Sequence, residues 1–106
     1  MNYIEKRIFR RLETQVPVEV ELGQQPLKTK TVNISCGGMF LKLKEENLPP
    51  NIEDLDLVIH LPNQNKPVKL SAELNRRSNQ GVAVEFQGLY NDNILAIEKF
   101  IKSHLN

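Results

Sequence analysis

The sequence predicts an all-β domain with a terminal helix, namely a six-stranded antiparallel β-barrel followed by one C-terminal α-helix. Three observations support this prediction. Six short runs alternate apolar and polar residues, which is the pattern of half-buried strands. Turn-forming stretches rich in Gly, Pro, Asn and Ser separate these runs. After the last run, the apolar residues take up the spacing of an amphipathic helix.

The alternating runs define the six expected strands. In the first run, Val16, Val18 and Val20 alternate with Pro17 and Glu19, so that one face of the strand is apolar. A closed barrel is favoured over an open sandwich, because closure leaves no long unprotected strand edge. The expected strands cover residues 16–22, 27–34, 39–43, 55–61, 68–74 and 82–86.

The C-terminal stretch is expected to form the helix, which packs on the barrel and plugs one opening. Asn91 or Asp92 is a suitable N-cap, and Lys102 and His104 suit the negative end of the helix dipole. The apolar stripe that predicts this helix consists of Ile94, Ile97, Ile101 and Leu105, widened by Leu95 and Phe100.

The length of 106 residues leaves room for one hydrophobic core, so a single domain over residues 1–106 is expected. A composition with 40% hydrophobic and 25% charged residues is that of a folded chain. Residues 1–15 show no strand pattern and are expected to form a mobile arm. The barrel is expected at residues 16–88 and the helix at residues 91–105.

Charge and cysteine content restrict the classes of partner. The net charge of +1 gives no overall field that favours DNA, RNA or a membrane surface, so neither a nucleic-acid polymer nor membrane insertion is expected. The single cysteine, Cys36, excludes an intrachain disulfide and a Cys-rich zinc site, and neither a metal nor a cofactor is expected. No apolar stretch suits a signal peptide or a membrane span, which predicts a cytoplasmic protein.

Two segments are not explained by the strand and helix patterns. A basic segment precedes the first strand, and a glycine-containing loop joins the second strand to the third. Because one hairpin of an antiparallel sheet separates the two segments, we expect them to meet at the same edge. The basic segment contains Lys6, Arg7, Arg10 and Arg11, and the loop contains Asn33, Ser35, Gly37 and Gly38.

The residue types in these segments suit a guanine nucleotide. The planar fork of arginine binds phosphate oxygens in pairs, and the same fork pairs with O6 and N7 of guanine. Asn33 and Ser35 can offer donors and acceptors to a base edge, while Gly37 and Gly38 let a ligand approach the backbone closely. Taken alone, either segment has an ordinary alternative interpretation, as a solvated basic terminus or as a capped turn.

The two segments resemble the motifs of the PilZ domain family. Arg7-x-x-x-Arg11 is similar to the RxxxR motif of that family, and Asn33-x-Ser35-x-x-Gly38 is similar to its D/NxSxxG loop. The resemblance covers nearly the whole chain and implies a six-stranded antiparallel barrel with a C-terminal helix. It also implies a cyclic di-GMP receptor that regulates a partner protein, with motility, adhesion, exopolysaccharide synthesis or virulence as the output.

The resemblance implies a role for each matching residue. Arg7 and Arg11 would contact the phosphates and guanine edges of cyclic di-GMP. Asn33 and Ser35 would reach a guanine from the loop, and Gly38 would shape that loop. Both one and two ligand molecules per site are compatible with the motifs. Further candidate ligand contacts are Lys6, Arg10, Gly37 and Arg77.

Two alternatives of other classes remain open. The first is a PilZ-like scaffold that binds no nucleotide and acts only through protein contacts. The second is a small barrel for single-stranded nucleic acid, which is disfavoured by the near-neutral charge and by the absence of Trp for base stacking. An enzyme is not expected, because the sequence shows no Ser-His-Asp arrangement, Walker-type loop or paired metal-ligand spacing.

Overall fold

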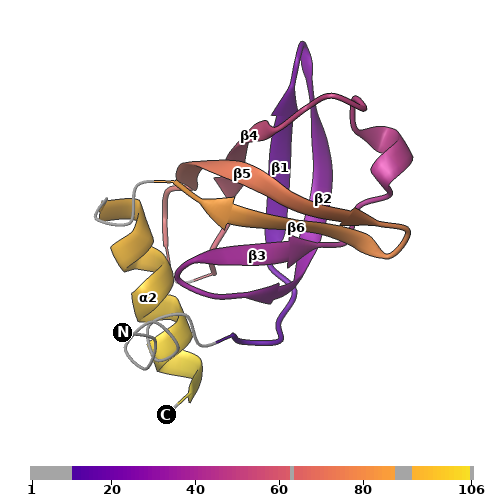
Figure 1. Cartoon of the computed structure of the whole chain (residues 1–106). Helices are drawn as coiled ribbons and strands as arrows, with labels where there is room; N and C mark the ends of the chain where they lie inside the picture. The colour runs from indigo at the N-terminus through magenta and orange to yellow at the C-terminus, as the bar shows by residue number, and fades with distance from the viewer. Residues whose placement is uncertain (1–10, 63, 88–91, 106) are drawn as a thin grey trace.

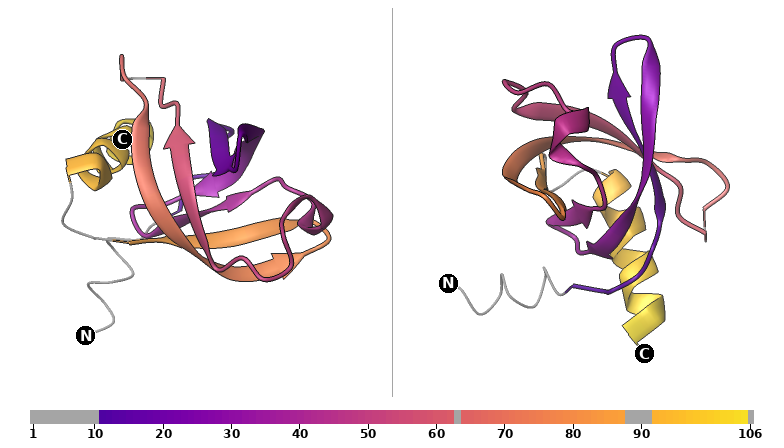
Figure 2. Two further views of the ribbon diagram at one scale, coloured as in Figure 1. Left: turned by 90° about the horizontal axis from the view of Figure 1, so that it is seen from above. Right: turned by 90° about the vertical axis from the view of Figure 1, so that its right-hand side faces the viewer.

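The structure, a computed structural model, describes residues 11–62, 64–87 and 92–105. It confirms the expected barrel of six antiparallel strands with one C-terminal helix (Figure 1). The helix lies against one side of the barrel, as further views show (Figure 2). The elements are β1 (Pro17–Leu22), β2 (Gln25–Ile34), β3 (Gly38–Leu41), the single 3-10 turn η1 (Glu45–Asn47), β4 (Asp54–Ile59), β5 (Val68–Ser78), β6 (Gly81–Phe86) and α2 (Asp92–Leu105).

The strand order around the barrel is β1-β2-β3-β6-β5-β4, and β1 closes the barrel by pairing with β4. Hairpins join β1 to β2, β2 to β3, β4 to β5 and β5 to β6. The remaining neighbours, β3 with β6 and β1 with β4, are distant in the sequence. These two long-range ladders close the sheet, so no strand is left as a free edge along its whole length.

The core is formed by the inward positions of the alternating runs. Val18 and Val20 of β1 are buried, whereas Glu21 on the same strand is exposed. Ile97 and Phe100 of α2 belong to the same buried cluster as the strand residues. Fully burying an aliphatic or aromatic side chain contributes about 1.5–3 kcal/mol. The helix therefore completes the core of the barrel rather than resting on its surface.

One residue of the expected apolar stripe of α2 does not face the core. Leu95 is 51% exposed, so the expectation that it widens the buried stripe is wrong. The helix begins at Asp92, while residue 91 lies outside the described residues. The side chain of Asn93 donates a hydrogen bond to the carbonyl of Lys69 in β5 at 2.6 Å, which fixes the first turn of the helix to the barrel. None of the described helices is long and apolar enough to cross a membrane.

Part of the expected N-terminal arm is hydrogen bonded to β2. Residues 1–10 lie outside the described residues. The hydroxyl of Thr31 donates to the carbonyl of Thr14 at 2.6 Å and accepts from the amide of Val16 at 2.9 Å. Thr31 is buried, so these bonds are shielded from water. The chain immediately before β1 is consequently held along the side of β2.

Candidate functional site

The basic segment and the glycine-containing loop meet in space at the end of β2. Leu12 and Ile34 form an antiparallel bridge with two backbone hydrogen bonds of 2.8 and 3.0 Å. This bridge places Arg11 beside Asn33. The Nη1 atom of Arg11 donates a hydrogen bond to Oδ1 of Asn33 at 2.7 Å. The expected meeting of the two segments is therefore confirmed for the described part of the basic segment.

The Arg11–Asn33 pair is accessible to a ligand. Arg11 is exposed and Asn33 is half-buried. A guanidinium carries five N–H donors in a fixed plane, and the hydrogen bond to Asn33 uses a single nitrogen of that fork. The remaining donors can bind an anionic oxygen or the acceptor edge of a purine. The amide of Asn33 holds the fork in place and adds its own donor group.

The hydroxyl of Ser35 shapes the loop from the inside. Ser35 is only 3% exposed, and its Oγ accepts hydrogen bonds from the amides of Gly37 and Gly38, each at 3.2 Å. The amide of Ser35 donates to the carbonyl of Gly38 at 2.8 Å. The serine side chain thus caps the backbone amides of its own turn, which is a common role of a short hydroxyl side chain. A contact between Ser35 and a ligand stays a prediction.

Gly38 lies at the point where the loop enters the sheet. It faces Glu85 of β6, and a Cβ atom added at this position would lie 2.1 Å from the carbonyl oxygen of Val84. The neighbouring Gly37 accepts a hydrogen bond from the amide of Phe86 at 2.8 Å. The absence of a side chain at Gly38 therefore lets the loop pack directly on the backbone of β6. The expectation that Gly38 shapes the loop has this physical basis.

Cys36 is part of the core rather than of the exposed surface. Its side chain is 5% exposed and belongs to the buried cluster that includes residues of α2. Burial raises the pKa of the Cys36 thiol, the nearby carboxylate of Glu98 raises that pKa further, and the ammonium of Lys102 opposes the shift. A protonated thiol is a poor nucleophile. Cys36 lies in the loop between β2 and β3, and its side chain belongs to the same buried cluster as residues of α2.

The structure does not bring Arg77 to this site. Arg77 pairs with Val82 at the start of β6, while Gly38 pairs near the end of that strand. Its Nη2 atom donates to the carbonyls of Pro49 at 2.8 Å and Ile52 at 3.2 Å. The guanidinium therefore fastens the segment before β4 to β5. The other basic candidates, Lys6, Arg7 and Arg10, lie outside the described residues.

Two residues that position the site were missed in the sequence. Leu12 is half-buried and carries the bridge to Ile34, and Thr31 holds the chain that follows. Leu12 is an apolar residue directly after Phe9 and two arginines, and Thr31 falls on an inward position of its strand. Both signals were present, but neither indicates a contact without knowledge of which strands are neighbours.

Comparison with known proteins shows which solved structures share this fold. The structure is similar to that of the Bacillus subtilis inhibitor of motility, MotI/DgrA, with a TM-score of 0.74 and 21% identity. That match covers 92% of this chain, which spans only 50% of the length of the inhibitor. The PilZ domain of CeSA from a cellulose-synthesizing bacterium matches with a TM-score of 0.70 and 17% identity, over 88% of this chain and 98% of that domain.

A further similar structure is an uncharacterized Legionella protein, with a TM-score of 0.60 and 20% identity over 92% of this chain and all (100%) of that protein. At these identities the structural matches establish the fold. No curated protein matches the sequence significantly. The sequence itself matches the PilZ domain over residues 5–103, a range that includes both the basic segment and the loop. The chain therefore belongs to the PilZ domain family.

Proposed function

We propose that this chain is a receptor for cyclic di-GMP that regulates a partner protein. The observation that carries the proposal is the hydrogen bond between Arg11 and Asn33, because it joins the two family motifs in one exposed site. Arg7 and Arg11 would bind the phosphates and guanine edges, and Asn33 and the loop of Ser35 and Gly38 would hold a guanine. Lys6, Arg10 and Gly37 are further proposed contacts.

The chemistry of the ligand matches that of the site. Cyclic di-GMP presents two phosphates and two guanines, and arginine recognises both groups with the same planar fork. The described loop offers no free charge of its own, so the basic segment must supply the electrostatic part of binding. The proposal is a receptor rather than an enzyme, and the similarity to a motility inhibitor supports regulation of another protein as the output.

Isothermal titration calorimetry with cyclic di-GMP tests the proposal directly. The Arg11→Ala variant removes a charge-assisted donor group, and each such bond contributes about 1.5–3 kcal/mol, so we expect affinity to fall by about 10- to 100-fold. Arg7→Ala is expected to do the same. The matched control is Arg76→Ala, because Arg76 is also exposed but lies on β5, away from the loop. It should bind like the wild type.

Two results would contradict the proposal. If the wild-type protein gives no binding heat and no chemical-shift change with cyclic di-GMP, the chain is not a receptor for it. That result would favour the alternative of a scaffold that acts only through protein contacts. If Arg11→Ala and Arg76→Ala weaken binding equally, the effect is one of general charge and the site is misplaced. GTP in place of cyclic di-GMP should bind weakly, since it lacks the second guanine.

Arg77 separates a structural role from a ligand contact. Its two hydrogen bonds to backbone carbonyls lead us to expect that Arg77→Ala lowers the free energy of unfolding by about 1–3 kcal/mol. Affinity for cyclic di-GMP should stay unchanged in the folded variant. Urea denaturation followed by circular dichroism measures the first quantity and calorimetry the second. A loss of affinity at unchanged stability would instead indicate that Arg77 contacts the ligand.

A further inference from the structure

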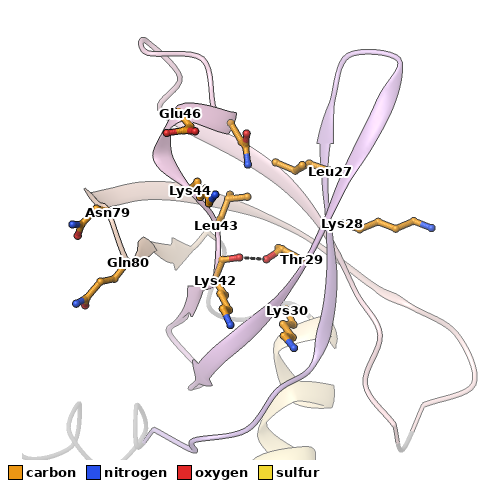
Figure 3. Close-up of a pocket in the computed structure, with 11 residues that line it drawn as sticks. Leu27, Lys28, Thr29, Lys30, Lys42, Leu43, Lys44, Glu46, Asn79 and Gln80 are labelled. Carbon is orange, nitrogen blue, oxygen red and sulfur yellow. Dashed lines mark hydrogen bonds between the residues drawn. The ribbon is translucent and has the colours of Figure 1, made fainter.

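A second surface of the barrel is hollowed, and its lining contains four lysines and one acidic residue, Glu46. A hollow of about 680 Å³ lies between the first half of β2 and the segment that follows β3 (Figure 3). It includes Leu27 and Thr29 from β2 and Leu43 from the segment after β3, with Asn79 and Gln80 of the β5–β6 turn at its rim. It lies toward the opposite end of β2 from Asn33.

The backbone of β2 has an open edge in this hollow. On this side, β3 pairs with β2 only from Thr31 onward, and the last backbone hydrogen bond is the amide of Lys42 donating to the carbonyl of Lys30 at 2.9 Å. The hydroxyl of Thr29 makes one further contact, donating to the carbonyl of Lys42 at 2.5 Å. In an antiparallel strand, alternate residues direct their N–H and C=O groups to the same side. Lys28 therefore directs its backbone groups to the same side as Lys30. Among the described residues, β3 provides no partner for Lys28 there.

Three exposed lysines flank this edge. Lys30 lies on β2, and Lys42 and Lys44 lie on the facing segment. In Figure 3 the side chains of Lys30 and Lys42 point in the same direction from the two sides of the hollow, while Lys28 points away from the hollow. None of these lysines forms an ion pair with a residue whose side chain the structure describes. Like charges held this close repel one another, so an anionic partner would relieve the repulsion.

The floor of the hollow is apolar. Leu43 is buried and Leu27 is half-buried, and both occupy inward positions of their segments. The lysines occupy the outward positions of the same two segments. Along both segments, exposed lysines thus alternate with inward leucines. This alternation has a period of two residues, which is also the side-chain period of an extended chain.

We propose that this surface binds an extended acidic segment of a partner protein, which adds as a strand to the open edge of β2. Acidic side chains on one face of that segment would meet Lys30, Lys42 and Lys44. Apolar side chains on its other face would lie over Leu27 and Leu43. Strand addition at a sheet edge is a recurrent mode of peptide recognition.

A peptide fits this surface better than a nucleotide or an oligonucleotide. The edge offers both an N–H donor and a C=O acceptor at Lys28, and an added strand supplies a partner for each. Phosphate oxygens only accept hydrogen bonds, so a phosphate group could pair with the N–H but not with the carbonyl, whereas a strand supplies both partners at the spacing of the edge. The apolar floor also gives no platform for stacking a base, because neither leucine presents an aromatic ring. The proposal is independent of cyclic di-GMP binding at the Arg11 site.

The probe for this proposal is a fluorescent peptide of about eight residues that alternates glutamate and valine. Fluorescence anisotropy measures its binding to the full chain, and amide chemical shifts of the labelled protein locate it. We expect shifts concentrated at residues 25–30 and 42–47. The double variant Lys30→Glu/Lys42→Glu should weaken the peptide by about tenfold or more, because charge reversal turns attraction into repulsion. Lys66→Glu, on an exposed loop elsewhere, is the matched control and should bind like the wild type.

Changes to the peptide test strand addition without altering the protein. N-methylation of alternate backbone amides removes the donors that pair with an edge and should abolish binding. Equal binding of the methylated peptide would overturn strand addition. Equal weakening by Lys66→Glu would overturn the placement, and no binding of the acidic peptide would overturn the proposal as a whole. Binding of an oligothymidine to this surface in place of the peptide would show a nucleic-acid site instead.

Discussion

Replacing Gly38 by alanine is expected to destabilise the protein by about 3 kcal/mol or more, and to lower the yield of folded chain. The added Cβ would lie 2.1 Å from the carbonyl oxygen of Val84, which is backbone and cannot rotate away. The clash can be relieved only by moving β3 away from β6. That ladder is one of the two long-range pairings that close the barrel. Urea denaturation followed by circular dichroism measures the loss.

Gly23→Ala is the control for this prediction. Gly23 has a φ of 63°, and a Cβ there meets nothing within 4 Å. Only backbone strain should therefore result, at a cost of about 1–2 kcal/mol. If Gly38→Ala costs no more than Gly23→Ala, the close approach of β3 and β6 is not as described.

This result also governs how the loop motif is interpreted. A loss of cyclic di-GMP binding in Gly38→Ala would not identify a ligand contact, since the variant is expected to be strongly destabilised. Arg11 is different because it is exposed and its described hydrogen bond is to the side chain of Asn33. Substitutions at Arg11 can therefore report on binding, whereas substitutions at Gly38 report mainly on the barrel.

Local patterns in the sequence predicted the strands and the meeting of Arg11 with Asn33. Strict alternation at Val16, Val18 and Val20 reflects one buried face, and the structure buries all three. The meeting of Arg11 with Asn33 followed from a single hairpin between them, which is a short-range argument. The first prediction required only neighbours in the sequence, and the second required only one hairpin, which spans the sequence separation of 22 residues between Arg11 and Asn33.

Features that depend on distant neighbours could not be predicted in this way. Nothing in the alternation of β3 or β6 says that these strands pair, so the clash at Gly38 was invisible. Leu95 fits the helical spacing, yet the direction in which α2 docks leaves it exposed. Arg77 resembled a free cation at a strand end, because its partners are backbone carbonyls that carry no sequence signal. Cys36 is buried by α2, which begins more than half the chain later.

The contacts of Cys36 connect the proposed ligand site with the helix. Cys36 lies in the loop between Ser35 and Gly37, and the charges of Glu98 and Lys102 on α2 act on its thiol. In Figure 1 the loop between β2 and β3 lies beside α2. A ligand would contact the exposed side of the loop, while the buried side of the loop packs in the same core cluster as α2. The state of the helix should be coupled to the state of the loop.

Replacing Phe100 by alanine is expected to destabilise the protein by about 3–5 kcal/mol, because Phe100 is only 1% exposed and its removal leaves a cavity under α2. The ring also lies 4.4 Å from that of His104, so the last turn loses a packing partner as well. Domains of this kind are stable by about 5–15 kcal/mol in total. The variant should consequently be marginal, and thermal or urea denaturation will measure the loss. Leu95→Ala, on the exposed side of the same helix, should change stability by under about 0.5 kcal/mol.

The thiol of Cys36 reports whether α2 has loosened in the Phe100→Ala variant. It is the single cysteine of the chain and is 5% exposed, so alkylation by N-ethylmaleimide, followed by mass spectrometry, reads one site. Under conditions where the variant is still mostly folded, we expect Cys36 to react faster than in the wild type, while Leu95→Ala leaves its rate unchanged. A Phe100→Ala variant that is destabilised but keeps a protected thiol would show that α2 and the loop are not coupled. Faster alkylation that slows again when cyclic di-GMP is added would show that the ligand and the helix act on the same loop.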